Sequence, residues 1–337
     1  MTKRLAASAA LVVAIATVTG CGGGGGGKSS VVLYNGQHPE LTSALVSAFQ
    51  RQSGITVNRK DGDSLVIATQ ILQEGHSSPA DVVLTENSPE LMTLEQHGLL
   101  AQLPKSVLAQ VPKVDESPSG NWVGVALRIS SLAYDPKLVA RSQLPKSILD
   151  LAQPRWKGKV AVSPTDSDFP PIVGAVIERF GQARAALWLQ GLKRNAQTYQ
   201  DEEAVTAAVN RGDVALGIIN HYYWYRLRLE IGAHAMHSSL YYFPDGDPGS
   251  IVNVSGIGVL ASSKHRAAAL KFIRFVISPD GQRLLAKGDD FEYPALPGVA
   301  ANPALTPFAK TPHTTVSVAK LGDGSTAARL IRETGLI

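Results

Sequence analysis

Two adjacent tyrosines, Tyr222 and Tyr223, follow an apolar run in the segment GIINHYYWYR and could do chemistry through their phenol oxygens. A phenol ordinarily loses its proton only at about pH 10, so two phenolates at neutral pH require a strongly charged cation. Hard oxygen ligands suit hard metal ions, and a bound metal displaces ligand protons. Ferric iron fits this description, whereas zinc, which prefers nitrogen and sulfur, fits poorly. The alternative is that the aromatic run packs a helix onto a sheet.

Further polar side chains follow other predicted strands at the points where those strands end. Ligands bind at the carboxyl ends of parallel strands, where loops and helix N-termini face a crevice. Neighbouring side chains normally diverge, but at the start of a helix both can lean towards one point beyond its end. We therefore expect one imidazole, several carboxylates and the two phenols to converge: His38, Glu86, Asp166, Ser167, Asp168, His221, Tyr222 and Tyr223. Taken singly, His38 is equally typical of a surface turn, and Glu86 of the cap of the next helix.

Short β-branched runs alternate with amphipathic segments, which is typical of an α/β fold with parallel strand pairing. Strands are predicted over residues 31–34, 81–84, 159–163, 214–219 and 257–261. Helices are predicted over 41–52, 64–74, a segment capped by Ser88 and ending at Gly98, 172–180, 183–192, 202–210, 221–231 and 267–277. Residues 121–134 form a long extended stretch that could cross between lobes. A chain of 337 residues usually exceeds one hydrophobic core, so two α/β lobes are expected.

Composition narrows the class of protein. The chain is 44% hydrophobic and 18% charged, as in a soluble globular protein. Its 32 Lys and Arg against 28 Asp and Glu give a net charge of +4, and losing Lys3 and Arg4 would leave +2 (30 against 28). So small a charge, without a basic block, argues against nucleic acid as a partner. No G-x-S-x-G, H-E-x-x-H or phosphate-binding loop motif points to an enzyme.

The N-terminus has the features of an export signal. Lys3 and Arg4 precede an apolar stretch, residues 5–18, that is too short for a membrane span. Val18-Thr19-Gly20-Cys21 resembles a bacterial lipobox, and Cys21 is the sole cysteine. We expect residues 1–20 to be a signal peptide and residues 21–30, with six glycines, to be a lipidated tether. The mature protein would then be extracytoplasmic and anchored to the cell membrane through Cys21.

Five segments make a resemblance recognisable. They are YNGQH (34–38), SPADVVLTENSPEL (78–91), NHYYWY (220–225), DPGSIVNVSGIGVL (247–260) and EYPALPGV (292–299). Together they resemble the ferric-ion-binding periplasmic proteins of ABC iron importers, in the same order and over nearly all of the mature chain. The resemblance implies a type II periplasmic-binding-protein fold, with two α/β lobes joined by two crossing hinge strands. It also implies a monomer that carries Fe(III) to an ABC permease and its ATPase, and that is not an enzyme.

The resemblance also assigns roles to residues and lobes. His38 and Glu86 would be ligands from the first lobe, and Tyr222 and Tyr223 would supply phenolates from the second. Metal would then bridge the lobes and stabilise the closed form that the permease reads. The lobes would comprise residues 31–129 with 253–303, and residues 130–252 with 304–337.

The chain departs from its relatives where many of them hold a small synergistic anion. The corresponding loop is Asp166-Ser167-Asp168, whose two carboxylates should repel phosphate or carbonate. Glu202 stands where relatives carry a neutral polar residue, and only Asn220 and Arg128 keep an anion-friendly character. We expect that Asp166 or Asp168 either replaces the anion as a direct ligand or pairs with Arg128. The alternative is that both aspartates are solvated loop residues.

Two other functions fit parts of the sequence. The same fold could bind a cationic organic solute, polyamine-like or thiamine-like, in a cleft lined by acidic and aromatic side chains. A metal-dependent hydrolase could use His38 as a base, with the metal held by carboxylates.

Overall fold

A computed structural model describes residues 30–337 of the chain. The predicted signal peptide, the predicted lipidation site Cys21 and almost all of the predicted tether lie outside the described residues. Ser30, the last residue assigned to the tether, already belongs to the first strand. No helix in the described part of the chain combines the length and the apolar character that crossing a membrane requires.

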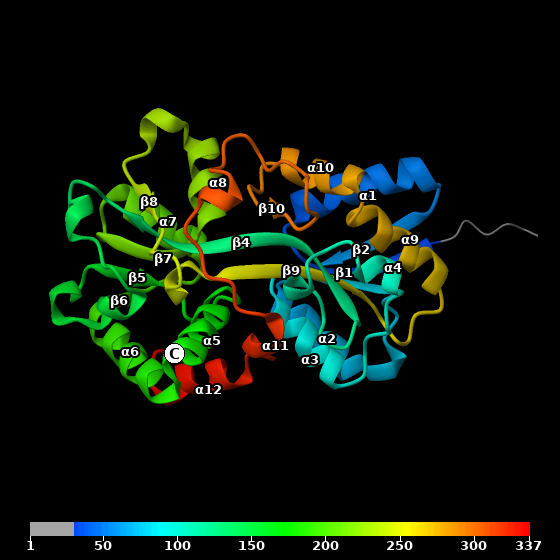
Figure 1. The fold of residues 1–337 in the computed structure, drawn as a ribbon, viewed down its shortest axis with the longest axis horizontal. Coiled ribbons are helices and arrows are strands. Elements are labelled where there is room, and N and C mark those ends of the chain that lie inside the picture. The colour runs from blue at the N-terminus through cyan, green and yellow to red at the C-terminus, as the bar shows by residue number, and fades with distance from the viewer. Residues whose placement is uncertain (1–29) are drawn as a thin grey trace, which may run out of the picture.

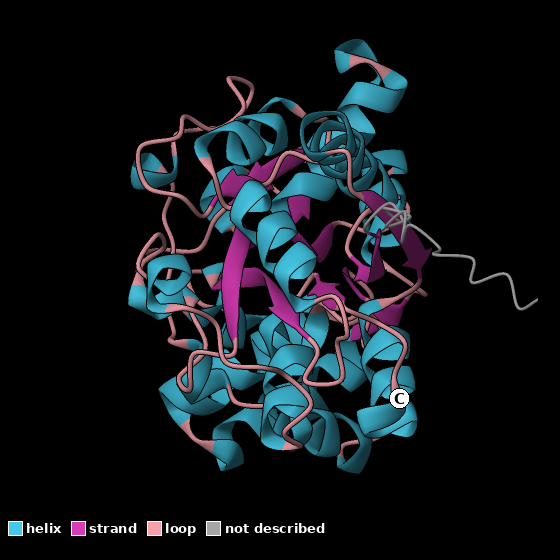
Figure 2. Cartoon of the chain, turned by 90° about the vertical axis from the view of Figure 1, so that its right-hand side faces the viewer, coloured by secondary structure: helices cyan, strands magenta, loops and turns pink. Residues whose placement is uncertain are grey.

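Strands occupy the interior and helices surround them (Figures 1 and 2). The strands are β1 (Ser30–Gly36), β2 (Thr56–Asp61), β3 (Val82–Thr85), β4 (Trp122–Tyr134), β5 (Val160–Val162), β6 (Ala196–Thr198), β7 (Leu216–Asn220), β8 (Ser239–Tyr241), β9 (Val252–Val259) and β10 (Tyr293–Pro294). The helices are α1 (Pro39–Ser53), α2 (Ser64–Glu74), α3 (Ser88–Gln96), α4 (Lys105–Leu108), α5 (Phe169–Phe180), α6 (Gln182–Asn195), α7 (Glu202–Arg211), α8 (His221–Ile231), α9 (Arg266–Val276), α10 (Pro279–Lys287), α11 (Val318–Leu321) and α12 (Ser325–Glu333).

The long strands β4 and β9 run side by side through the middle of the protein (Figure 1). The strand order is β2-β1-β3-β9-β4-β7-β5-β6, with β8 and β10 also paired to β4. Parallel pairing is confirmed for β1 with β2 and β3, and for β5 with β6 and β7. It is wrong for β4 and β9, which pair antiparallel with each other and with β7 and β3. These two strands cross between the halves of the sheet, so no βαβ connection imposes a parallel direction on them.

Two hydrophobic cores lie on either side of this crossing. One gathers β1, β3, α1 and α9, with Leu33 and Phe272 fully buried, and it extends to residues of α7 and α8. The other gathers β5, α5, α6 and α12 around Trp188. Strand β4 contributes to both cores, through Ile129 to the first and Leu132 to the second. Every residue of this 13-residue strand is buried, as expected for an element covered along its whole length.

Several helix ends differ from the sequence-based expectation. Helix α5 begins at Phe169, three residues before the predicted start, because Pro170 and Pro171 fit a first helical turn, whose N–H groups have no intrahelical partner. Asn87, not Ser88, is the N-cap of α3. Helices α2 and α8 have the predicted bounds, and Asn220 is the N-cap residue of α8. Strand β2 and helix α12 were not predicted, although the buried residues Ala327, Leu330 and Ile331 of α12 lie at helical spacing.

Candidate metal-binding site

The two tyrosines converge at the start of α8, as predicted. Strand β7 ends at Asn220, and Tyr222 and Tyr223 lie in the first turn of the helix that follows. Their ring centroids are 4.2 Å apart. Both hydroxyls donate to the same atom, Oδ2 of Asp168, over 3.0 Å from Tyr222 and 3.4 Å from Tyr223. The two phenol oxygens therefore both lie within reach of one carboxylate oxygen, close enough together for a single ion beside that oxygen to contact both.

Asp168 is the hub of this cluster. It is the N-cap residue of α5 and is fully buried. Its second oxygen, Oδ1, accepts a hydrogen bond from Nδ2 of Asn87 over 2.9 Å and lies 3.4 Å from a guanidinium nitrogen of Arg128. Asp168 is thus held from α8, from the loop before α3 and from β4. The alternative of a solvated loop residue is wrong for Asp168, because no water-accessible surface remains on it.

His38 and Glu86 lie next to the tyrosines and come from other elements. His38 precedes α1, and Glu86 follows β3. Nε2 of His38 is 3.1 Å from Oε1 of Glu86, and the His38 ring meets the ring of Tyr222 edge-on at a centroid distance of 5.1 Å. The backbone N–H of His38 donates to Oε1 of Gln37, which fixes the start of the loop. The predicted meeting of imidazole, carboxylate and phenols is confirmed.

Arg128 lies next to the Tyr222 ring and neutralises part of the negative charge of the cluster. It projects from β4 and is fully buried. Its guanidinium lies 3.4 Å from Asp168, 3.8 Å from Glu86 and 3.5 Å from Glu292, and 5.4 Å from the centre of the Tyr222 ring. Burial lowers the pKa of Arg128, but the surrounding acidic groups raise that pKa further, so the cation persists. One cation facing three carboxylates is poorly placed to attract an additional anion.

Burial sets the protonation of the phenols. It raises the pKa of Tyr222 well above 10, and the Asp168 carboxylate raises that pKa further. The pKa of Tyr223 is raised well above 10 for the same two reasons. Without a metal, both side chains are therefore neutral hydrogen-bond donors. A strong cation is needed to displace their protons.

The facing imidazole and carboxylate are also shifted. Burial raises the pKa of Glu86 to about 7, although His38 and Arg128 oppose that rise. Burial lowers the pKa of His38, but the charges of Glu86 and Glu292 outweigh this and leave it above its usual value. The pair can therefore hold or release a proton close to neutral pH.

Four other candidates surround the cluster without contacting the tyrosine hydroxyls. Asp166 accepts from the backbone N–H groups of Asp168 (3.0 Å) and Glu202 (3.1 Å), and burial together with Asp168 raises its pKa to about 8. Ser167 contributes its carbonyl oxygen, which accepts from Asn87 over 3.3 Å. Glu202 accepts from the backbone N–H of Asn220. His221, the first residue of α8, accepts a hydrogen bond from the backbone N–H of Ile129 through Nδ1.

Sequence reasoning missed two carboxylates beside His38. Oε1 of Glu292 is 3.6 Å from Nδ1 of His38, and Oδ1 of Asp290 is 3.9 Å from the same nitrogen. Glu292 opens the EYPALPGV motif, yet it lies far along the chain and ends no predicted strand. The three acidic residues Asp289, Asp290 and Glu292 in this short segment were the available signal.

A metal ion in this cluster would draw on the phenol oxygens as ligands. In the described part of the chain, His, Cys, Asp and Glu side chains alone form no group of three that could hold a metal ion. The two tyrosine oxygens add the donors that the nitrogen and carboxylate ligands lack. Such a mixed, oxygen-rich set suits a hard, highly charged ion.

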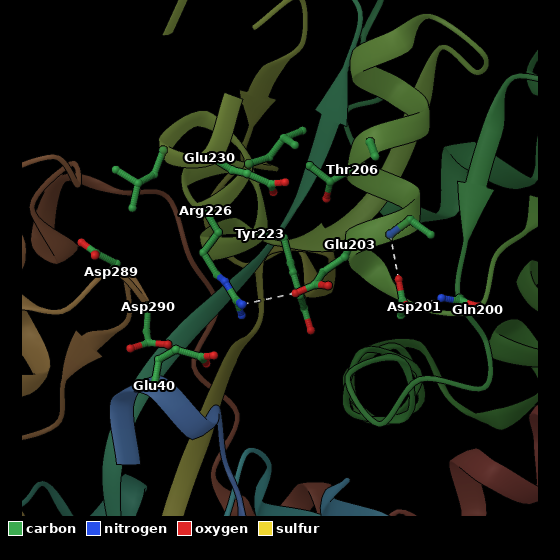
Figure 3. Close-up of a pocket in the computed structure, with 14 residues that line it drawn as sticks. Glu40, Gln200, Asp201, Glu203, Thr206, Tyr223, Arg226, Glu230, Asp289 and Asp290 are labelled. Atoms are coloured by element: carbon green, nitrogen blue, oxygen red, sulfur yellow. Dashed lines mark hydrogen bonds and ion pairs between the residues drawn. The ribbon is translucent and has the colours of Figure 1, made fainter. Parts of the chain in front are cut away.

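A cavity of about 620 Å³ opens beside the tyrosines (Figure 3). Tyr223 and Asp290 line it and so connect it to the cluster. Arg226 contributes one cation, 3.4 Å from the Glu203 carboxylate across the dashed contact in Figure 3. Six carboxylates line the same cavity, from α1, α8, and the segments around α7 and after α10: Glu40, Asp201, Glu203, Glu230, Asp289 and Asp290. The approach to the tyrosines is therefore acidic.

Comparison with known proteins finds relatives that bind ferric iron. The Fe(3+)-binding periplasmic protein of Serratia marcescens is 39% identical over 91% of this chain and 90% of its own length. The major ferric iron-binding protein of Neisseria meningitidis is 36% identical over 91% of this chain and 93% of its own. The crystal structure of iron-bound HitA from Pseudomonas aeruginosa superposes with a TM-score of 0.87 at 41% identity, covering 91% of this chain and 99% of that one.

These similarities identify the fold and the class. The fold is that of the two-lobed type II periplasmic binding proteins, as the sequence resemblance implied. The relatives are binding proteins and not enzymes, which contradicts the hydrolase alternative. Residues 77–314 match the family described as bacterial extracellular solute-binding proteins. The chain belongs to this family of bacterial extracellular solute-binding proteins.

Proposed function

We propose that this protein binds Fe(III) in the cleft between its lobes and delivers it to the permease of an ABC importer. Tyr222 and Tyr223 supply phenolates, and His38 and Glu86 supply a nitrogen and a carboxylate from the other lobe. The observation that carries the proposal is the convergence of both phenol hydroxyls on Oδ2 of Asp168, next to the His38–Glu86 pair. Ferric iron is also the ion named for the relatives that are 36–39% identical.

The carboxylate of Asp168 takes the place of an exogenous anion in this proposal. Its Oδ2 lies at the point that both phenols address, and its Oδ1 engages Arg128, the cation that would otherwise hold an anion. Asp166 is one layer further out, where it accepts two backbone N–H groups, so it supports the loop and does not bind metal. Ser167, Asn220 and Glu202 belong to the same supporting layer.

The lobes carry the two halves of the site. We propose that residues 31–129 and 253–303 form one lobe and residues 130–252 and 304–337 the other, with β4 and β9 as the crossing strands. Metal that bonds to His38 and Tyr222 at once then favours the closed form. Lipidation of Cys21 keeps the monomer at the cell membrane, close to the permease and its ATPase. The permease recognises the closed form.

A titration with Fe(III) tests the metal and its ligands together. We expect a visible phenolate-to-iron charge-transfer band in the wild type, which weakens strongly in Tyr222→Phe and Tyr223→Phe. Phenylalanine keeps the ring and removes only the oxygen. Tyr242→Phe is the matched control, because the buried hydroxyl of Tyr242 has no hydrogen-bond partner among residues 30–337. A wild type that stays colourless with stoichiometric Fe(III), or a Tyr242→Phe variant that loses the colour, would contradict the proposal.

The acidic cavity supports a second candidate, a cationic organic solute. Six carboxylates against Arg226 would attract a polyamine-like or thiamine-like cation, and Tyr223 offers it an aromatic face. Spermidine and thiamine titrated calorimetrically against metal-free protein separate the two candidates. Micromolar binding of either cation, with no colour on adding Fe(III), would favour the organic solute.

A further inference from the structure

Glu292 occupies a position that the metal site itself does not explain. It is a buried carboxylate between two cationic or protonated partners: Oε1 is 3.6 Å from Nδ1 of His38, and Oε2 is 3.5 Å from Arg128. Neither Nδ1 of His38 nor Oε1 of Glu292 has a hydrogen-bond partner within the 3.5 Å limit in the described part of the chain. A donor and an acceptor left without other partners, and facing each other slightly beyond that limit, are complementary.

The other ring nitrogen of His38, Nε2, faces different groups. Nε2 faces Glu86, the other ligand proposed from this lobe, and the His38 ring meets that of Tyr222 edge-on. An imidazole binds a metal through an unprotonated nitrogen, and the hydrogen bond made by the second nitrogen decides which one that is. A carboxylate on Nδ1 retains the proton there. Nε2, which lies 3.1 Å from Glu86 in this structure, then has no proton of its own to lose when the ion binds.

The backbone around Glu292 holds it firmly. Phe291 has a φ of 54°, a left-handed conformation that costs a phenylalanine about 1–2 kcal/mol and that no other non-glycine residue of the described chain adopts. Its ring stacks on Tyr225 of α8 at 5.5 Å. On the other side, Tyr293 stacks on His221 of α8 at 5.1 Å. Glu292 is therefore fixed between two aromatic contacts with the helix that carries Tyr222 and Tyr223.

We infer that Glu292 is the positioning residue for His38: its carboxylate accepts the Nδ1 proton and presents Nε2 to the ion. Because α8 holds both neighbours of Glu292, the same segment aligns the imidazole of one lobe with the phenols of the other. This inference rests on the proposed iron site. It gives a role to the first residue of the EYPALPGV motif, which the ligand set leaves without one.

Glu292→Gln is the sharpest perturbation, because the carboxylate faces a donor on each side. A glutamine has one acceptor oxygen, which the charged Arg128 takes, so its NH₂ group faces His38. The imidazole must then accept at Nδ1 and carry its proton on Nε2. Nitrogen NMR of histidine-labelled, metal-free protein in alkaline solution reads the tautomer directly. Because Glu86 competes for the proton at Nε2, the test is the difference between the two proteins. We expect a larger fraction of the Nδ1-protonated form in the wild type than in Glu292→Gln; equal fractions in both would overturn the inference.

A double-mutant cycle tests the consequence for iron. Outer-shell partners of a histidine ligand typically contribute about 10–100-fold in metal affinity. We expect a loss of that size for Glu292→Gln in the wild type and little further loss in a His38→Ala background, because Glu292 acts through His38. Asp290→Asn is the matched control, since the Asp290 carboxylate lies 3.9 Å from Nδ1 of His38 and borders the cavity. The loss of Fe(III) affinity in this variant should stay under about threefold.

The two readouts separate this inference from the proposed function. Equal losses from Glu292→Gln with and without His38 would show a general charge effect and refute the positioning role, even in a protein that binds iron. A wild type that binds no Fe(III) would refute the proposed function, while the NMR experiment would still decide whether Glu292 sets the His38 tautomer.

Discussion

Iron binding should release about two protons at pH 8, because the metal must displace the protons of both phenols. Tyr222 and Tyr223 each donate a hydrogen bond to Asp168, and burial and that carboxylate keep each pKa well above 10. The metal-free protein is therefore fully protonated at both sites. The iron-bound form carries two phenolates, so roughly two protons leave for each ion bound.

The pH dependence of affinity follows from this stoichiometry. A release of two protons raises the affinity about a hundredfold for each unit of pH, which is about 2.7 kcal/mol. The sign is fixed by the pKa shift: a group whose pKa is high without metal and low with metal favours binding as pH rises. Below about pH 7 the release should exceed two, because burial raises the pKa of Glu86 to about 7 and its proton must leave as well.

A pH-stat titration measures the release directly. Ferric nitrilotriacetate is added to unbuffered protein, and a protein-free blank corrects for protons taken up by the chelator. Tyr222→Phe and Tyr223→Phe should each release about one proton fewer, and Tyr242→Phe should match the wild type. A wild-type release of one proton or fewer at about pH 8 would mean that the two phenols do not both bind the ion, and the reasoning would fail.

Three further outcomes are expected. Asp168→Asn should make Fe(III) affinity rise about tenfold or more with added phosphate, because an exogenous anion then replaces the charge-assisted bond of the Asp168 carboxylate to Arg128. An equal phosphate dependence in the wild type would argue against the proposal that Asp168 takes the place of the anion. Burial raises the pKa of Glu90 to about 8, so the folded state binds the extra proton, and the unfolding free energy should fall as pH rises from about 5 to 8. Glu90→Gln should flatten that fall and gain on the order of 2–4 kcal/mol at about pH 8, as urea unfolding will report. Gly256→Ala should lower the unfolding free energy by about 1–3 kcal/mol, since a Cβ there would lie 2.6 Å from Leu91 and 2.8 Å from Trp122; an unchanged urea midpoint would show that β9 can shift.

Local signals in the sequence determined much of the scaffold. The bounds of α2 and α8 followed from capping residues, helical periodicity and terminal glycines. The position of Tyr222 and Tyr223 at a strand-to-helix junction followed from the same signals. The strand-end rule also selected His38 and Glu86, which follow the parallel strands β1 and β3. Strand β7 runs opposite to these strands, so tertiary structure, and not a shared sheet edge, brings the two residues to the phenols.

Tertiary structure alone decided which acidic groups complete the cluster and which cation they meet. Asp166 and Asp168 are equivalent in the sequence, yet only Asp168 reaches the tyrosines. Its carboxylate caps no N–H group of α5 and accepts from the phenols, whereas that of Asp166 accepts from backbone N–H groups. Arg128 and Glu292 are far apart along the chain, and antiparallel pairing of β4 with β10 brings them together. Local sequence signals specify helices and strands within short windows, whereas contacts across more than a hundred residues depend on how those elements pack, so this part of the site was visible only in the folded protein.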